Sequence, residues 1–183
     1  MSFAIDQLIA DCQVAIAEDQ PALAVRDVVR RALERPGDVA DAFGARDGGL
    51  NLLHVAPDLT VLHVTWAPGM RLYPHNHQMW AVIGIYGGQE DNIFYRRDGQ
   101  ALVESGGKAL AERDVLVLGD DAIHAVENPL GRLTGAIHVY GGDFVNEPRS
   151  QWPPETGLEE PWDMTQVNRQ FAEANEAWRG QST

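Results

Sequence analysis

The sequence contains a single cysteine and a single lysine, and both scarcities narrow what the protein can be. With only Cys12 available, a disulfide within the chain and a cysteine-rich zinc site are both excluded. Because Cys12 lies in a helical apolar pattern, we expect a buried thiol. Apart from Lys108 the basic residues are all arginines, a bias for which the sequence offers no physical reason.

Positive charge is also in short supply, since 27 acidic residues outnumber 14 basic ones and the net charge is −13. So acidic a surface repels phosphate backbones, and we expect no nucleic-acid partner. No apolar run approaches the roughly 18 residues that a membrane span requires. The first six residues carry no basic region and no signal-peptide core. We therefore expect a cytoplasmic protein that does not associate with membranes.

The length of 183 residues and the apolar content of 44% fit one globular domain over residues 1–183. Residues 1–46 are predicted to form a helical extension. Apolar residues recur every three or four positions from Ile5 to Ile16, with Ser2 as a cap. Pro21 suits the start of a second helix, which Pro36-Gly37 should end, and a short third helix is predicted over Asp38–Phe43.

After Gly48-Gly49 the pattern changes to short β-type segments separated by turns. The predicted strands are Leu50–Val55, Thr60–Trp66, Trp80–Tyr86, Asn92–Arg97, Ala101–Glu104, Val115–Leu118, Ala122–Glu127 and Leu133–Tyr140. Strands at this spacing without helices between them predict an antiparallel barrel or jelly roll over residues 47–145. Residues 146–183 should form a loop and a C-terminal helix capped by Asp163. The predicted fold class is mainly β, with the terminal helices packed outside the barrel.

Three of the six histidines form a pattern typical of a metal site. His75 and His77 stand two residues apart in an extended segment, so their side chains share one face. His124 arrives from another strand and can complete the set. Three neutral imidazoles on one side of a metal leave its other side open to substrate, oxygen or water. Such ligands suit Fe(II), Ni(II), Cu and Zn, so they do not select the metal.

Two segments of the chain resemble the paired motifs of the cupin superfamily. Gly69-Met-Arg-Leu-Tyr-Pro-His75-Asn-His77 resembles the first motif, and Gly119-Asp-Asp-Ala-Ile-His124-Ala-Val-Glu-Asn128 resembles the second. The glutamate usual in the first motif would fall near Trp80 or Ala81, and neither residue can bind a metal. The resemblance implies a double-stranded β-helix whose metal site holds three histidines and no carboxylate.

Three histidines without the glutamate resemble the site of the thiol dioxygenases, the cysteine dioxygenase type of cupin. Three further segments agree with this resemblance. They are Trp66 before the first motif, Val126-Glu127-Asn128-Pro129 in the second, and the segment from Trp80, which looks like the bacterial branch that includes the mercaptopropionate dioxygenases. Ile137-His138-Val139-Tyr140 resembles the His-x-Tyr of that family. The resemblance implies Fe(II), with O2 oxidising a small thiol to a sulfinate. It also implies that Tyr140 donates a hydrogen bond beside the iron and that His138 orients Tyr140.

The chain departs from that family in two places. The cysteine that crosslinks to the tyrosine in animal enzymes would fall near Val82, so no crosslink can form. The arginine that binds the substrate carboxylate is missing from the strand that reads Leu50-Asn51-Leu52-Leu53-His54. The candidates for contact with the substrate are therefore His54 as a weaker anchor, Arg71 or Arg96 as the missing cation, and Tyr73 and Trp80 as walls of the pocket.

Several of these residues also have a purely structural interpretation. Tyr140 and His138 could serve only to satisfy each other's hydrogen bonds, and Trp66 and His63 could be core residues. Asn128 could fix a turn. The three arginines of this region could form a solvated face, namely Arg71, Arg96 and Arg97. Two other functions remain open as well. One is a different metal-dependent cupin enzyme, such as a lyase, a hydrolase or a carbon–carbon cleaving dioxygenase. The other is a non-catalytic cupin that binds a metal or ligand. Both monomer and homodimer are compatible with the sequence.

Overall fold

The computed structural model describes residues 3–99 and 101–181 and opens with three helices, as predicted. They are α1 (Ile5–Ala15), α2 (Pro21–Ala32) and α3 (Pro36–Phe43). α3 starts two residues earlier than predicted because Pro36 occupies its first turn, where a missing N–H costs nothing. The N-cap of α1 is Ala4, which makes no side-chain capping bond, and the predicted cap Ser2 lies outside the described residues.

The strands follow from Gly49 onwards. They are β1 (Gly49–Val55), β2 (Thr60–Trp66), β3 (Arg71–Asn76), β4 (Ala81–Gly87), β5 (Gln89–Asp98), β6 (Ala101–Ala111), β7 (Val115–Leu118), β8 (Ile123–Glu127), β9 (Thr134–Tyr140), β10 (Ser150–Gln151) and β11 (Glu160–Pro161). The predicted set lacked β3, β10 and β11. It also began β5 three residues late and ended β6 seven residues early, because the β5–β6 ladder continues through Gly106-Gly107 despite their low strand propensity.

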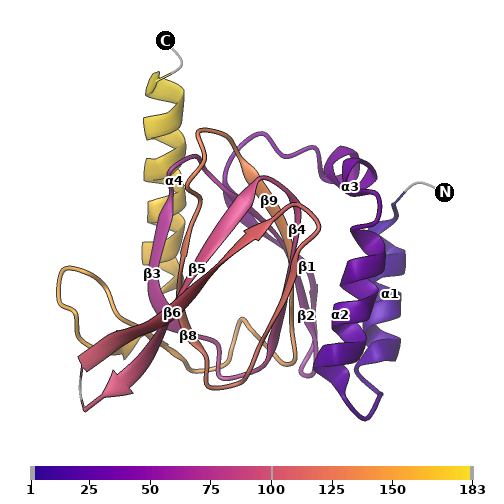
Figure 1. Cartoon of the computed structure of the whole chain (residues 1–183), viewed down its shortest axis with the longest axis horizontal. Helices are drawn as coiled ribbons and strands as arrows, with labels where there is room; N and C mark the ends of the chain where they lie inside the picture. Colours follow the sequence, from indigo (N-terminus) through magenta and orange to yellow (C-terminus); the bar gives the residue numbers. More distant parts are fainter. Residues whose placement is uncertain (1–2, 100, 182–183) are drawn as a thin grey trace.

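The strands form two antiparallel sheets. One sheet has the order β1-β2-β9-β4-β7, and the other has the order β11-β10-β3-β8-β5-β6. Apart from the β5–β6 hairpin, which stays in one sheet, the chain alternates between the sheets from β2 to β9, so that β2, β9, β4 and β7 face β3, β8, β5 and β6 (Figure 1). This is the strand order of a jelly roll, and it confirms the predicted double-stranded β-helix.

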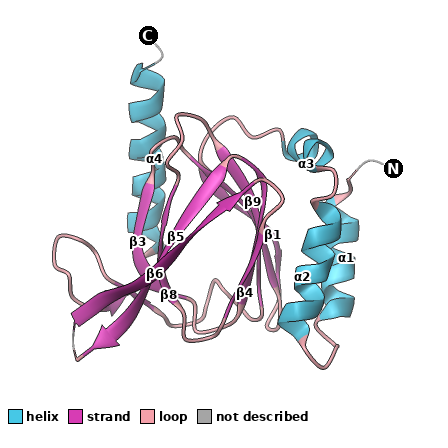
Figure 2. Ribbon diagram, in the orientation of Figure 1, coloured by secondary structure: helices cyan, strands magenta, loops and turns pink. Residues whose placement is uncertain are grey.

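Side chains of the first sheet alternate between the barrel interior and the helices. On β9, Ala136 and Tyr140 join the interior core, whereas Ile137 and Val139 pack in the outer core with α1 and α2. Figure 2 shows the three N-terminal helices gathered on this one side of the barrel. Cys12 belongs to the same outer core, and its burial raises the pKa of the thiol to about 12, so the predicted buried thiol is confirmed.

The last helix, α4 (Met164–Gln181), lies on the opposite side of the barrel from α1 and α2 (Figure 1). Asp163 caps it as predicted, since Asp163 Oδ1 accepts a hydrogen bond from the backbone N–H of Thr165 at 2.8 Å. Phe171 of α4 stacks on Trp66, with 5.4 Å between the ring centroids, and so closes the interior core from this side.

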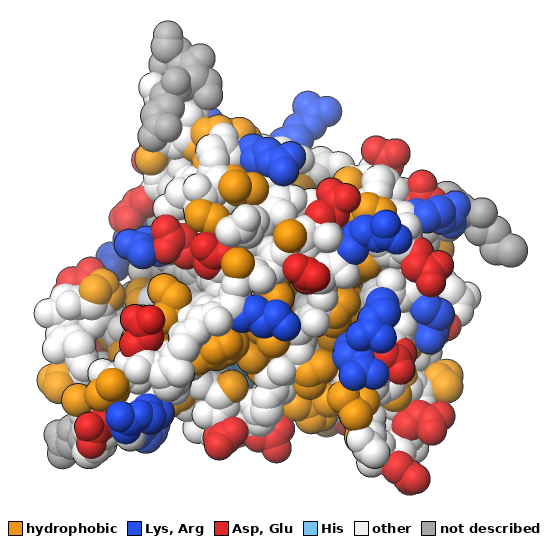
Figure 3. All heavy atoms as spheres, viewed as in Figure 1, with side chains coloured by type: hydrophobic (Ala, Val, Ile, Leu, Met, Phe, Trp, Pro, Cys, Tyr) orange, Lys and Arg blue, Asp and Glu red, His pale blue; other side chains and the backbone are white. Residues whose placement is uncertain are grey.

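Among the described helices, none combines the length and the apolar character that crossing a membrane requires. The face of the molecule shown in Figure 3 carries acidic and basic side chains interspersed, with hydrophobic side chains between them.

Candidate metal centre

Three buried histidines converge inside the barrel, as the sequence predicts. His75 lies on β3 directly opposite His124 on β8, and His77 follows just after β3 ends. One ligand nitrogen from each ring lies within 4.8 Å of the others. The Nε2 atoms of His77 and His124 are 3.3 Å apart, close to the separation of two nitrogens that share a metal at about 2.1 Å.

Hydrogen bonds at the far side of two rings leave their Nε2 atoms free to bind a metal. His75 Nδ1 donates to the Tyr73 carbonyl at 3.0 Å, and His124 Nδ1 donates to Asn92 Oδ1 at 2.6 Å. A ring whose Nδ1 carries the proton keeps its lone pair on Nε2. His77 Nδ1 is buried and has no hydrogen-bond partner among the described residues.

The electrostatics of the group also fit a metal. Burial lowers the pKa of His75 to about 4. Burial, aided by the neighbouring histidines, lowers the pKa of His77 and of His124 well below the ordinary value. All three rings are therefore neutral at physiological pH, which is the form that binds a divalent cation. No carboxylate enters from β4, because the interior position next to Tyr140 in the sheet register is Ala81.

The histidines line a narrow cavity of about 20 Å³, which has room for roughly one water molecule. Most of its wall is apolar or aromatic, and the other titratable side chains among the described lining residues are those of His138 and Tyr140. The Tyr140 ring lies edge-on to His77, with 5.0 Å between the centroids, and its hydroxyl lies 3.1 Å from His138 Nδ1. The structure thus brings the predicted His-x-Tyr pair to the predicted metal ligands.

Glu90 on β5 is an interior carboxylate that the sequence analysis did not single out. Its side chain is fully buried, and it accepts hydrogen bonds from Trp66 Nε1 at 2.6 Å and from Asn92 Nδ2 at 3.0 Å. His138 Nε2 lies 3.3 Å from the same carboxylate. Burial alone would raise the pKa of Glu90, but His138 and these hydrogen bonds hold it below the ordinary value. Glu90 therefore contacts the neighbours of the ligand group and is not part of it.

Arg149 is the second residue that the sequence did not single out. Its side chain is 5% exposed and lies over the rings of Phe144 and Trp162, at 3.8 and 4.4 Å from their centroids. Both rings line the cavity. Nη1 donates to the Phe144 carbonyl, whereas Nε and Nη2 are buried and unpartnered in the part of the chain that the structure describes. Burial lowers the pKa of Arg149 to about 10, so the guanidinium stays charged.

The five predicted substrate contacts lie outside this cavity. Arg71 is exposed and forms an ion pair with Glu127, and Arg96 is exposed on β5. The Tyr73 hydroxyl donates to Gln151 Oε1 at 3.0 Å, Trp80 packs against the outer core, and His54 is half-buried on β1. None of the five is among the residues that line the cavity, although the backbone carbonyl of Tyr73 accepts the hydrogen bond from His75 Nδ1.

The residues with a structural interpretation are placed as follows. Asn128 Nδ2 donates to three backbone carbonyls, among them Trp66 at 3.1 Å, and so fixes its turn as predicted. Trp66 is a core residue, yet its indole also binds Glu90. His63 is buried on the outer face of β2, where it contacts Tyr86, Asn51 and Thr65.

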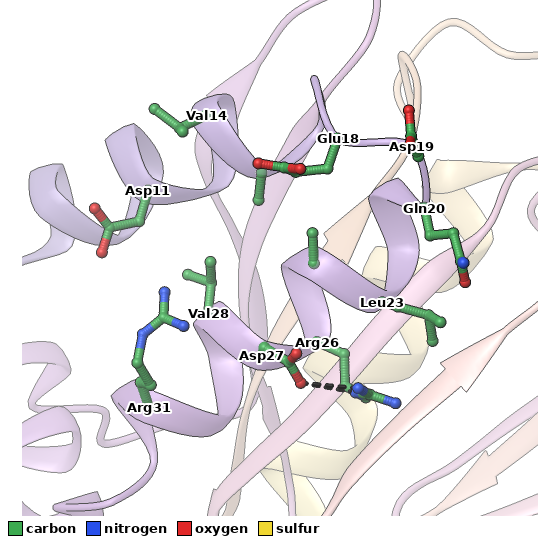
Figure 4. Close-up of a pocket in the computed structure, with 12 residues that line it drawn as sticks. Asp11, Val14, Glu18, Asp19, Gln20, Leu23, Arg26, Asp27, Val28 and Arg31 are labelled. Atoms are coloured by element: carbon green, nitrogen blue, oxygen red, sulfur yellow. Dashed lines mark hydrogen bonds and ion pairs between the residues drawn. The ribbon is translucent and has the colours of Figure 1, made fainter.

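A much larger hollow lies elsewhere, between α1 and α2, with a volume of about 690 Å³ (Figure 4). Charged side chains such as Asp11 and Arg31 stand around it, and no histidine lines it. Asp27, part of its lining, is paired with Arg26 at 2.9 Å. We place the functional site at the histidines because they form the one group of three or more possible metal ligands among the described residues.

Known proteins resemble this chain at low sequence identity. No protein-family model matches the chain, and no curated protein matches it. Many solved structures do. An uncharacterized conserved protein with a double-stranded β-helix domain from Klebsiella pneumoniae is 13% identical over 57% of this chain and 79% of that chain, with a TM-score of 0.47. BH2720 from Bacillus halodurans is 13% identical over 57% and 77%, with a TM-score of 0.50.

A third structure is an RmlC-like cupin family protein with a double-stranded β-helix fold from Methanocaldococcus jannaschii. It is 10% identical over 55% of this chain and 84% of that chain, with a TM-score of 0.46. The structural neighbours are thus cupin and double-stranded β-helix proteins, and at such identities the likeness concerns the fold alone. Together with the strand order, the buried histidine group fits a metal-dependent cupin.

Proposed function

We propose that the protein is an Fe(II)-dependent dioxygenase of the thiol dioxygenase type, which oxidises a small thiol carrying a carboxylate to a sulfinate. The observation that carries the proposal is the convergence of three neutral imidazoles, without a carboxylate ligand, next to the His138–Tyr140 pair. The proposal also agrees with the resemblance of the two histidine motifs and of the His-x-Tyr segment to that class of cupin.

In this proposal His75, His77 and His124 hold the metal through their Nε2 atoms. A bound Fe(II) ion would lower the pKa of the substrate thiol and supply the redox chemistry that O2 needs. The net reaction converts a thiolate and O2 into a sulfinate, so that both oxygen atoms end on sulfur, which loses the four electrons that O2 gains. No further reductant is required.

Tyr140 provides a polar group that lines the same cavity as the three histidines. Its phenol is buried, and burial raises its pKa, so it stays protonated, with one proton to donate and an oxygen that can accept a hydrogen bond. His138 holds the phenol by its contact at 3.1 Å, and Phe144 packs on the ring of Tyr140 at 4.2 Å between centroids. These contacts limit the directions in which the hydroxyl can point, which suits a group that must meet the reacting atoms.

Arg149 supplies the cation that the sequence-based candidates do not bring to the cavity. A buried guanidinium without a counter-charge is costly, and an anionic ligand would remove that cost. Its unpartnered Nε and Nη2 atoms form one edge of the guanidinium, the edge that binds a carboxylate through two parallel hydrogen bonds. The Trp162 indole nitrogen is likewise buried without a partner among the described residues. A carboxylate beside Phe144 and Trp162 would use these donors.

The decisive experiment measures oxygen uptake by Fe(II)-loaded protein with cysteine, 3-mercaptopropionate and cysteamine. We expect uptake with an acidic thiol, one sulfinate formed per O2 consumed, and little uptake with cysteamine, which has no carboxylate. No uptake with any thiol contradicts the proposal. Uptake with carbon acids alone would indicate a different oxygenase, and tight metal binding without any turnover would indicate a metal-binding or ligand-binding cupin.

A further inference from the structure

Glu90 is a fully buried carboxylate that no step of the proposed reaction uses, and its hydrogen bonds lead towards the site in two directions. We propose that Glu90 is a positioning residue that orients Asn92 and His138 at once, and thereby fixes the Nε2 atom of His124 for a metal and the direction of the Tyr140 hydroxyl. The inference depends on the histidine group as a metal site but not on thiol oxidation.

The first direction leads from Glu90 through Asn92 to His124. A carboxylate can only accept hydrogen bonds, so the NH2 end of the Asn92 amide must face Glu90 Oε1, 3.0 Å away. The carbonyl end of that amide then faces His124 Nδ1 at 2.6 Å and can only accept from it. His124 must therefore carry its proton on Nδ1, which leaves Nε2 unprotonated for the metal.

The second direction leads from Glu90 through His138 to Tyr140. Glu90 Oε2 accepts from the Trp66 indole and lies 3.3 Å from His138 Nε2, so this nitrogen of His138 carries a proton. His138 Nδ1 then carries the lone pair and accepts a hydrogen bond from the Tyr140 hydroxyl at 3.1 Å, which leaves the phenol oxygen as an acceptor for other groups. Glu90 thus imposes opposite tautomers on the two rings, with the proton on Nδ1 in His124 and on Nε2 in neutral His138.

The geometry of β5 explains how one residue reaches both targets. Side chains alternate along a strand, so Glu90 and Asn92 point into the barrel while Asp91 between them bonds to Gln89 on the other face. Burying a charge costs several kcal/mol unless donors surround it, and an apolar residue at this position would avoid that cost. Three donors reach this carboxylate, namely Trp66 of β2, Asn92 of β5 and His138 of β9. They keep Glu90 ionised and bonded both to Asn92 and to His138.

The substitution Glu90→Gln tests the proposal because an amide has one accepting atom where the carboxylate has two. In one orientation, the oxygen of the new amide faces Trp66 and His138, and its NH2 group then faces the NH2 group of Asn92. Two donors cannot bond to each other, so the Asn92 amide must rotate and turn its own NH2 group towards His124 Nδ1. If the amide is reversed, its NH2 confronts the Trp66 indole and His138 Nε2. Either way, at least one histidine must change its tautomer.

The primary readout is nitrogen NMR of metal-free protein labelled with 15N-histidine. We expect wild-type His124 to show the Nδ1–H tautomer and neutral His138 the Nε2–H tautomer, and Glu90→Gln to change at least one of them. The second readout is the Co(II) dissociation constant, which we expect to rise about tenfold or more in Glu90→Gln if the His124 tautomer changes. Unchanged tautomers with a dissociation constant within twofold of wild type would overturn the proposal.

Two further variants separate positioning from general damage. Asp91→Asn makes the same chemical change on the outward face of β5 and should alter neither tautomer nor Co(II) affinity; if it alters them as strongly as Glu90→Gln does, the effect is not specific and the proposal is wrong.

Asn92→Leu removes only the hydrogen bonds that link Glu90 to His124. The His124 tautomer and the Co(II) affinity should therefore change, while His138 keeps its tautomer. If Glu90→Gln does not fold, Asn92→Leu decides, since an unchanged His124 tautomer contradicts the proposal.

These measurements distinguish a failure of the inference from a failure of the proposed function. Tautomers are read in metal-free protein, and Co(II) affinity is read without substrate. A protein that consumes no oxygen with thiols can still show the Glu90 effect, and an active thiol dioxygenase can lack it.

Discussion

Buried histidines lie on both sides of the sheet that contains β2. His63 lies on its outer face and the three-histidine group lies on its inner side, and the two sides differ in how the ring nitrogens are used. His63 lies outside the barrel, where Nε2 meets the Tyr86 hydroxyl at 2.7 Å, Nδ1 meets Asn51 at 3.2 Å, and the ring stacks on Phe43 at 3.9 Å. Inside the barrel, His77 and His124 turn their Nε2 atoms towards each other. Burial lowers the pKa of His63 and of His75 alike, to about 4.

This comparison teaches that burial and a lowered pKa do not by themselves mark a functional histidine. His63 has the same charge state as the inner histidines, yet its ring is satisfied by neighbours from β1, β2 and β4. The inner group is distinguished by lone pairs that converge without donors to meet them. Each of the following predictions tests whether convergence is the feature that matters.

The largest effect is expected from His124→Ala. Removing the ligand that approaches from β8 leaves only His75 and His77, which come from one strand and its end. We expect most bound iron to be lost by elemental analysis, with a drop in affinity of about 100-fold or more. Retention of a full equivalent of iron would show that His124 is not a ligand.

Arg149→Met should weaken substrate binding more than it affects the metal. Loss of a charge-assisted hydrogen-bonding edge costs about 1.5–3 kcal/mol, so we expect KM for an acidic thiol to rise roughly 10- to 100-fold at unchanged iron content. Arg71→Met is the matched comparison, because Arg71 is exposed and paired with Glu127. Equal effects of the two substitutions would remove Arg149 from the proposed function.

Tyr140→Phe should keep the metal and slow turnover. The substitution removes only the hydroxyl that lies 3.1 Å from His138, while the ring packing against Phe144 remains. We expect oxygen consumption at saturating thiol to fall about tenfold, since one oriented hydrogen-bonding group is lost. Unchanged turnover would mean that Tyr140 and His138 only satisfy each other's hydrogen bonds and have no part in the reaction.

The smallest effect concerns pH and the outer histidine. A histidine whose pKa is lowered in the folded state takes up a proton more readily when unfolded, so metal-free protein should lose stability as the pH falls from about 6.5 towards 4. Each such histidine contributes about 1.4 kcal/mol per pH unit across that window. In His63→Phe this decline, measured by urea unfolding, should be shallower, and Co(II) affinity at pH 7.5 should stay within twofold of wild type. A large loss of affinity would mean that the two faces of the sheet are coupled.

Much of the architecture follows from local patterns. The apolar alternation of β2, β4 and β9 and the helical spacing of α1 and α2 are strong, and each was predicted close to its observed bounds. The spacing of His75, His77 and His124 predicts the group that the structure brings together. β3 was not predicted, because Arg-Leu-Tyr-Pro-His-Asn contains a proline and few residues of high strand propensity.

The residues that the sequence missed owe their places to contacts between distant segments. Glu90 stands in Gly-Gly-Gln-Glu-Asp-Asn, which is typical of a turn, and only its pairing with Leu110 makes it part of a strand with an interior face. Arg149 stands in a segment rich in proline and glutamate, and its burial depends on Phe144 and Trp162. A single signal could have raised interest in Glu90, namely the period of two that it shares with Asn92 and Phe94.

Two aromatic residues of the cavity wall, and the arginine that lies over them, come from a different part of the chain than the histidines. Phe144, Arg149 and Trp162 belong to the segment after β9, which the ion pair of Arg97 with Glu159 fastens to the β5–β6 hairpin. The ligands themselves sit on strands whose register is locked by neighbours on both sides. Under the proposed function, substrate preference and metal binding are therefore encoded by separate segments, and a redesign confined to residues 141–163 should change the preferred thiol while the three histidines keep their places.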